Sequence, residues 1–174
     1  MTTTDPIFSI HNTAVKINTT GNHEPRGSHV MNASFLTSLM QVAVHETGAD
    51  RALVCDTKLA IVASVKLKQD AVLSEQLTDH LHKAIVTGEP IITNNAVKEP
   101  EKAPNTKTSY DNLRGVVVIP VPGHGALYLD RPLKQGIISK AVVNKLVKLA
   151  RQTGQNVPSE TTESSLQELY QQIS

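Results

Sequence analysis

The sequence predicts an α+β fold in which a central antiparallel sheet of about five to six strands is flanked by helices. Two observations support this prediction. Residues 113–132 contain two runs rich in apolar and β-branched side chains around the turn Pro122-Gly-His-Gly125, which is the pattern of a β-hairpin. The remaining periodic segments follow in the order helix, two strands, helix, strand, long loop, then this hairpin and a last helix.

The hairpin is expected to lie in the middle of the sheet. Val116–Val121 and Ala126–Asp130 read as interior strands, because an unbroken apolar run indicates burial on both faces. Pro120 has no amide hydrogen for a neighbouring strand, so a bulge or a strand end is predicted there.

Three helices are predicted within the domain. The first runs from about Asn32 or Ser34 to Thr47, where apolar residues recur at spacings of three and four. The second spans Ser74–Thr87 and uses Ser74 as its N-cap. The third spans Ser139 to about Gln152, with apolar residues on one side and four cations on the other: Lys140, Lys145, Lys148 and Arg151.

The other strands are shorter. Ala52–Cys55 and Leu59–Leu67 form a pair around a turn, and Ile91–Thr93 forms a short strand. The following stretch, Asn94–Asn112, is polar, contains prolines and has no element of its own, which is typical of functional or disordered loops. We expect Asn95–Thr108 to be the most mobile internal segment.

The chain divides into three parts. Residues 1–30 are polar and form a weakly ordered arm in which 7–17 can add a peripheral strand. Residues 31–152 form the domain. Residues 153–174 form a linker and a short amphipathic helix, Ser164–Ile173, which at about ten residues is marginal alone in water and is expected to dock on another surface.

Composition narrows the functional classes. The 174 residues carry 17 Lys and Arg against 16 Asp and Glu, and only 3% are aromatic, with no Trp. A nearly neutral chain with few stacking side chains gives no reason to expect nucleic acid. No apolar run approaches the length of about 18 residues that a membrane span requires, and no signal peptide is recognisable. A cytoplasmic protein that binds no membrane is therefore predicted.

The residues that could carry chemistry do not form a set. Cys55 is the single cysteine and lies in a predicted strand, where a small buried side chain is expected rather than a reactive thiol. His80 and His82 are two residues apart on a helix and so cannot form a zinc pair. His124 lies in the hairpin turn and is expected to be solvated. No catalytic set and no metal site are predicted, and the chain is not expected to be an enzyme.

The block Val116-Val-Val-Ile-Pro-Val121, followed by Gly125-Ala-Leu-Tyr-Leu-Asp130, resembles the GAF family of small sensory domains. Leu81–Thr93 and the closing helix Ser139–Gln152 are also similar, so the resemblance covers about residues 32–152. It implies a GAF-like fold and a regulatory domain that binds a small molecule. The chain lacks the residue set of the cyclic-nucleotide members, the Cys-His pair of the bilin members and the several cysteines of the sulfoxide-reducing members. The cofactor is therefore unknown.

The resemblance also implies where a ligand sits, because in such folds the segment equivalent to 94–112 covers the ligand-binding face of the sheet. The candidate ligand-binding residues are the hydrogen-bonding groups at its two ends: Thr93, Asn94, Ser109, Tyr110 and Asp111. A loop that binds nothing is the alternative.

The predicted function is that of a GAF-like regulatory domain in cytoplasmic signal transduction, in which a small ligand or a partner changes the packing of the terminal helices. A ligand-free structural homodimerisation module is the alternative, and a thiol-based redox enzyme is the second alternative. A homodimer through the terminal helices is predicted, because the first helix is apolar on more of its circumference than one sheet face covers. Otherwise both terminal helices fold back on their own domain and leave a monomer.

Overall fold

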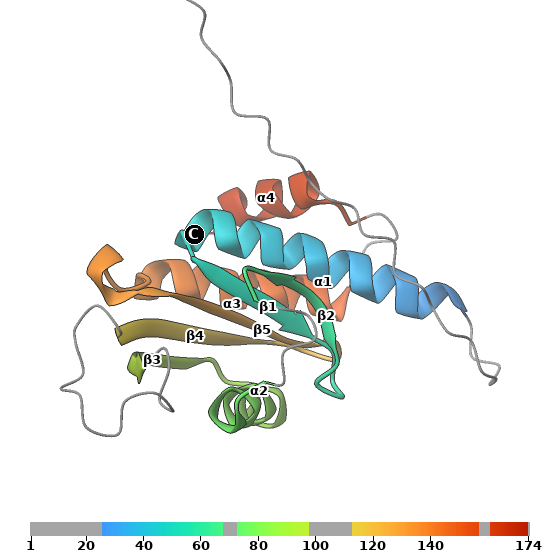
Figure 1. Ribbon diagram of the computed structural model, residues 1–174. Coiled ribbons are helices and arrows are strands. Elements are labelled where there is room, and N and C mark those ends of the chain that lie inside the picture. The colour runs from blue at the N-terminus through green and yellow to red at the C-terminus, as the bar shows by residue number, and fades with distance from the viewer. Residues whose placement is uncertain (1–25, 68–72, 98–112, 157–160, 174) are drawn as a thin grey trace, which may run out of the picture.

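The computed structural model describes residues 26–67, 73–97, 113–156 and 161–173 (Figure 1). Within them the elements follow the predicted order, and a helix closes the chain. They are α1 (Arg26–Thr47), β1 (Arg51–Cys55), β2 (Ile61–Val65), α2 (Glu75–Thr87), β3 (Ile91–Val97), β4 (Leu113–Val121), β5 (Gly125–Pro132), the short 3-10 helix η3 (Leu133–Gln135), α3 (Lys140–Gln155) and α4 (Glu163–Gln172).

The described strands form one five-stranded antiparallel sheet in the order β2-β1-β5-β4-β3. This confirms the predicted fold class and the interior positions of β4 and β5. The register of the hairpin runs without a bulge from Arg114 opposite Pro132 to Val121 opposite Gly125. Pro120 therefore pairs with Ala126, and β4 ends one residue later. On its other side β4 pairs with β3 only as far as Val118, so Pro120 lies where β4 has no second neighbour, as proline at a sheet edge does.

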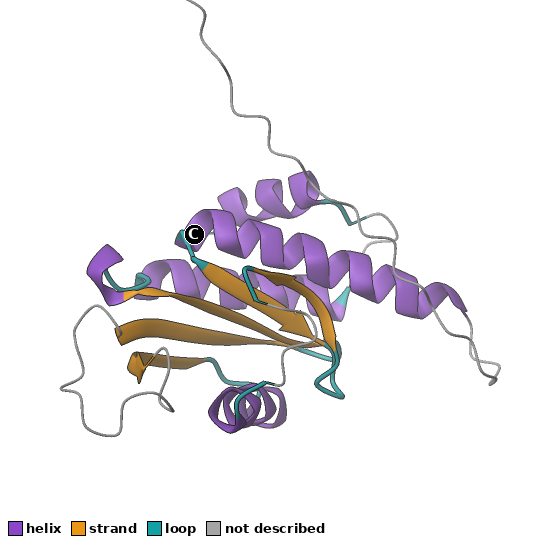
Figure 2. Ribbon diagram, viewed as in Figure 1, coloured by secondary structure: helices purple, strands orange, loops and turns teal. Residues whose placement is uncertain are grey.

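The sheet, with helices on both of its sides (Figures 1 and 2), separates two unequal apolar cores. Helices α1, α3 and α4 lie on one side of it and α2 lies on the other. Successive strand residues point to opposite faces, so each buried strand supplies both cores. In β5, for example, Leu127 and Leu129 belong to the larger core with α1, α3 and α4, whereas Ala126 and Tyr128 belong to the smaller core with α2.

Several element ends differ from the prediction. Helix α1 begins at Arg26, so it includes the last residues of the expected arm, whose remainder lies outside the described residues. Strand β2 is shorter than 59–67, because Leu59 and Lys66 adopt positive φ angles of 65° and 53°, in the left-handed region that a strand excludes. Helix α3 continues to Gln155, and the buried Thr153 donates to the carbonyl of Leu149 at 2.7 Å, so Thr153 is helical rather than part of a linker.

Strand β3 also differs, since it extends to Val97 rather than ending at Thr93. The start of the predicted loop is therefore part of the sheet, paired with β4 up to Val97 opposite Leu113. Residues 98–112, which include most of the segment expected to be mobile, lie outside the described residues.

Helix α4 folds back on its own chain. Its stripe residues Leu166, Tyr170 and Ile173 are 0%, 4% and 8% exposed and belong to the larger core together with residues of α1 and α3. The wide apolar surface of α1 is covered in the same way, by the sheet on one side and by α4 on another. These helices thus follow the fold-back alternative, and the homodimer stays a prediction that the stripe of α4 no longer supports.

Candidate functional site

Of the five predicted ligand-binding residues, the structure describes Thr93 and Asn94, and it places them on opposite faces of the sheet. Thr93 pairs with Val116, which faces the α2 side of the sheet. Asn94, the next residue of the strand, is exposed and lies on the opposite face, where its Oδ1 is 3.3 Å from the point that a Cβ on Gly115 would occupy. Ser109, Tyr110 and Asp111 lie outside the described residues. A ligand-binding role for these five residues stays a prediction.

On the α2 side, a buried carboxylate joins three strands. Asp130 of β5 is 0% exposed and accepts hydrogen bonds from two arginines. The Nη2 of Arg51 in β1 donates to its Oδ2 at 2.6 Å. The Nε of Arg114 in β4, a residue that is 3% exposed, donates to its Oδ1 at 2.7 Å. The hydroxyl of Tyr128 also donates a hydrogen bond to Oδ2 of Asp130, at 2.6 Å. This set is called the Asp130 network below.

The Asp130 network continues to the surface through Asp50. The Oδ2 of Asp50 accepts from the Nη2 of Arg114 at 2.8 Å, and its Oδ1 accepts from the Nζ of Lys66 at 3.0 Å. These two hydrogen bonds, that of Arg114 first, lower the pKa of Asp50 from 3.8 to about 2. Burial, followed by the charge of Asp130, raises the pKa of Tyr128. Asp50 is therefore ionised and Tyr128 is a neutral donor at neutral pH.

The Asp130 network is satisfied by hydrogen bonds between its own side chains. Throughout the described part of the chain, every buried side-chain nitrogen or oxygen has a hydrogen-bond partner. Both oxygens of Asp130 accept hydrogen bonds from neighbouring side chains. Sequence reasoning missed this network. The sequence feature that could have revealed it is an arginine near the start of each of two strands, Arg51 and Arg114, on the same face of the sheet as Asp130.

The single cysteine is buried, as predicted. Cys55 is 0% exposed, and its Sγ lies 3.6 Å from the carbonyl oxygen of Ala126. Burial raises the pKa of its thiol to about 11, so the nucleophilic thiolate is scarce at neutral pH. No group of three His, Cys, Asp or Glu side chains in the described ranges is arranged to hold a metal ion.

His124 is not solvated, and that prediction is wrong. It is half-buried, and its Nε2 lies 2.9 Å from the carbonyl oxygen of Gly154 in the last turn of α3. Its ring also packs edge-on against Phe35 of α1, with 5.4 Å between ring centroids. The carbonyls at a helix C-terminus lack partners within the helix, so His124 caps α3 and ties the hairpin turn to two helices.

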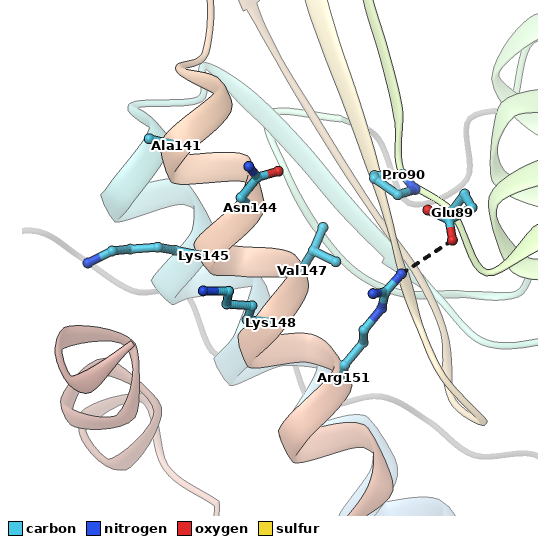
Figure 3. A pocket seen from close by; sticks show the side chains of 8 residues that line it. All are labelled: Glu89, Pro90, Ala141, Asn144, Lys145, Val147, Lys148 and Arg151. Atoms are coloured by element: carbon cyan, nitrogen blue, oxygen red, sulfur yellow. Dashed lines mark hydrogen bonds and ion pairs between the residues drawn. The ribbon is translucent and has the colours of Figure 1, made fainter. Parts of the chain in front are cut away.

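An open pocket of about 480 Å³ lies between α3 and the start of β3 (Figure 3). Glu89 and Pro90, which precede β3, form one wall and α3 forms the other, and the residues that line it are Glu89, Pro90, Ala141, Asn144, Lys145, Val147, Lys148 and Arg151. Arg151 points across the pocket, and its Nη2 lies 3.4 Å from the carbonyl oxygen of Gly88 and 3.5 Å from Oε1 of Glu89.

A second open pocket, of about 740 Å³, lies between α3 and α4 and is lined by Lys148, Gln152, Leu169, Gln172 and Ile173. Lys148 lines both pockets, so the two form one surface along α3. Beside it, the Nζ of Lys145 lies 5.6 Å from the ring centroid of Tyr170 in α4. We call the side chains that line the two pockets the α3 surface.

None of the helices in the described residues is long and apolar enough to cross a lipid bilayer.

Comparison with known proteins finds similar folds among solved structures but no related sequence. No family model matches the sequence, and no curated protein matches it either. Among solved structures, the GAF domain/HD domain protein from Geobacter sulfurreducens is similar with a TM-score of 0.52 and 12% identity, over 85% of this chain and 99% of that one.

Two further solved structures are less similar. One is the PixJ GAF domain of Thermosynechococcus elongatus in its blue-light absorbing form (TM-score 0.46, 15% identity, 86% of this chain and 92% of that one). The other is MglB of Myxococcus xanthus (TM-score 0.39, 11% identity, 80% and 92%). With identities this low, the similarity concerns the fold alone. The chain has a GAF-like α+β fold.

Proposed function

We propose that this chain is a non-enzymatic, GAF-like regulatory domain of cytoplasmic signalling, in which a small ligand or a partner bound at the α3 surface changes how the terminal helices pack. The observation that carries the proposal is the position of Lys148, which lines a pocket against the β3 edge and another against α4. A molecule bound there contacts the helix that joins the sheet to the end of the chain.

The packing behind the α3 surface supports a relay to α4. Val147 lines the first pocket and is also part of the larger core. That same core contains Val117 and Leu129 of the sheet and Leu166 of α4. Protein cores are densely packed, so a displacement of α3 is transmitted to its neighbours rather than absorbed in empty space.

The state of the reactive groups supports a regulatory role over an enzymatic one. The carboxylate of Asp130 is held by three neighbouring side chains, and the thiol of Cys55 is buried and protonated. General acid–base or nucleophilic catalysis needs a group that reaches its substrate. A thiol-based redox enzyme therefore remains the weakest of the three candidates.

A thermal-shift screen with a metabolite library tests the proposal, followed by hydrogen exchange on each hit. A ligand that binds only the folded state stabilises it by about 2.7 kcal/mol at a hundred times its Kd. We expect a hit to raise the melting temperature and to change amide exchange in α4 (Glu163–Gln172). A hit that leaves α4 unchanged contradicts the relay, and a library without hits favours the ligand-free structural module.

Two substitutions locate the site of any hit. Lys148→Ala removes a cation common to both pockets, whereas Thr93→Ala changes the α2 side of the sheet, where the sequence predicted a ligand. We expect Lys148→Ala to weaken binding and Thr93→Ala to leave it unchanged. The opposite result would favour the site predicted from Thr93, Asn94, Ser109, Tyr110 and Asp111.

A further inference from the structure

The α3 surface has a one-sided charge. Helix α3 contains Lys140, Lys145, Lys148 and Arg151 and has no acidic residue in its sixteen positions. Among the described residues that line the two pockets, three are cations of α3 and one, Glu89, is a carboxylate. Neutral amide side chains complete the polar part: Asn144, Gln152 and Gln172.

The same surface has apolar side chains between its charges. Leu169 of α4 is 37% exposed and lines the second pocket, whose floor includes Ile173, 8% exposed. The half-buried Pro90 and Val147, 7% exposed, line the first pocket. Cations around a partly apolar concavity are the complement of an apolar side chain flanked by carboxylates.

We infer that the α3 surface is the docking site for an acidic segment of a partner protein, in which an apolar side chain enters the pocket beside Leu169 and carboxylates lie on Lys148 and Arg151. The inference rests on the proposed function, since it names the kind of partner that acts on α3.

The contact between Arg151 and Glu89 shows how the carboxylates of a partner bind here. Oε1 of Glu89 lies 3.5 Å from Nη2 of Arg151, and the two side chains are 72% and 48% exposed. An exposed ion pair at this distance contributes little to stability, so a partner carboxylate replaces Glu89 at small cost. Guanidinium groups bind carboxylates with better geometry when both nitrogens take part, which the present contact leaves open to a partner.

The observations favour a protein segment over other polyanions. The apolar side of α3 is buried in the larger core, so the helix has no free apolar stripe to insert into a membrane. The formal charge of the whole chain is +1, which does not suit the long phosphate backbone of a nucleic acid. The pockets are concave, and they fit protruding side chains better than a flat charged surface.

The test is selection from a display library of random short peptides against the full chain. We expect the selected peptides to be enriched in Asp and Glu around an apolar residue, and their affinity to fall as salt is raised. Vesicles containing phosphatidylserine, a single-stranded oligonucleotide and a second copy of the chain are tested in parallel. Tighter binding of any of these than of the best peptide would overturn the inference.

Matched variants localise the binding. Lys148→Glu with Arg151→Glu is expected to weaken the selected peptides by at least about tenfold. Lys83→Glu with Lys134→Glu makes the same change in net charge at exposed lysines outside the α3 surface and is expected to leave affinity within about twofold. Leu169→Ser tests the apolar part and is expected to weaken binding while the fold persists.

The outcomes separate this inference from the proposed function. If no acidic peptides are selected, or if both double variants bind equally, the α3 surface is not an acidic docking site, although a small ligand can still act there. If acidic peptides bind the α3 surface but leave hydrogen exchange in α4 unchanged, the docking site stands and the relay is wrong. Melting temperatures of the variants show that each is folded before its binding is compared.

Discussion

Tyr128 donates its hydroxyl hydrogen to Oδ2 of Asp130 at 2.6 Å, and the two residues are next but one in the same strand. Both therefore face the α2 side, while Leu127 and Leu129 face α1 and α3. The run Leu-Tyr-Leu-Asp, on which the resemblance to GAF domains partly rests, thus has two structural roles. Leu127 and Leu129 fill the larger core. On the other face, Asp130 binds two arginines and Tyr128 donates to Asp130.

Asp130→Asn is expected to lower the free energy of unfolding by about 3–5 kcal/mol, because removing one charge from a buried pair leaves the other uncompensated. Arg114 is the residue most affected, since it is 3% exposed. Urea denaturation followed by circular dichroism measures the change. Asp50→Asn is the control, as the Asp50 side chain is 29% exposed and its loss should cost clearly less. Equal costs would mean that the Asp130 network is not the main electrostatic contact of the sheet.

Acid should weaken the contact between Asp50 and its partners. The pKa of Asp50 is lowered to about 2 in the folded chain from an ordinary value of 3.8. A carboxyl with a depressed folded pKa contributes stability that is complete above its unfolded pKa and is lost as pH falls through the folded one. The difference in unfolding free energy between wild type and Asp50→Asn should therefore be constant above about pH 5 and shrink toward pH 2. Lys66→Ala should reproduce part of this profile, whereas a difference that does not change with pH would contradict it.

Cys55→Ser should leave the protein folded and its ligand or peptide binding intact. The hydroxyl is nearly the same size as the thiol and meets the carbonyl of Ala126, so we expect a cost within the range of about 1–3 kcal/mol for burying a polar group. In the native protein the thiol should react slowly with a disulfide reagent, and in denaturant it should react at once. Rapid stoichiometric labelling of the native chain would contradict the burial of Cys55.

Gly125→Ala should be far more damaging than Gly123→Ala, although Gly123 lies in the hairpin turn and Gly125 immediately follows it as the first residue of β5. At Gly125 (φ +142°) an added Cβ would come within 1.9 Å of the carbonyl oxygen of Cys55, so the backbone of β1 would have to move. At Gly123 (φ +77°) nothing lies within 4 Å, and only the left-handed backbone costs energy, about 1–2 kcal/mol. Thermal unfolding compares the two. Similar melting temperatures would mean that β1 and β5 do not approach this closely.

Leu166→Ala and Leu169→Ala test where the stripe of α4 is buried. Leu166 is fully buried, and its truncation should cost about 2–5 kcal/mol, whereas Leu169 is 37% exposed and should cost little. Sedimentation of the wild type reports the predicted homodimer directly. If Leu166→Ala dissociates a dimer without unfolding the chain, the stripe is intermolecular.

The elements that could be predicted from the sequence are those set by local periodicity and turn residues. The hairpin follows from its apolar runs and glycines, and α2 has the predicted ends: the Ser74 side chain accepts from the amide of Leu77, and Gly88 is left-handed with φ +67°. These features depend on residues close together in the chain, which is why pattern reasoning reaches them.

The parts that were missed depend on residues far apart in the chain. Asp130 and Arg51 are 79 positions apart, and His124 and Gly154 are 30 apart, so their contacts exist only once the sheet order is known. The placement of Thr93 and Asn94, the two described residues of the predicted site, also depends on the sheet. Strand β3 continues past Thr93, and a strand turns consecutive side chains to opposite faces, which separates Thr93 from Asn94.

The helices on the two sides of the sheet differ in how many side chains they bury. Among the described helices, α2 buries only Leu81 and Ala84 fully, whereas α3 buries six residues. We therefore expect α2 to detach in local opening at a lower free energy than α1, α3 and α4, because it buries fewer side chains. Cys55 belongs to the core that such an event uncovers. The rate at which the Cys55 thiol is modified should therefore report how often α2 detaches from the sheet.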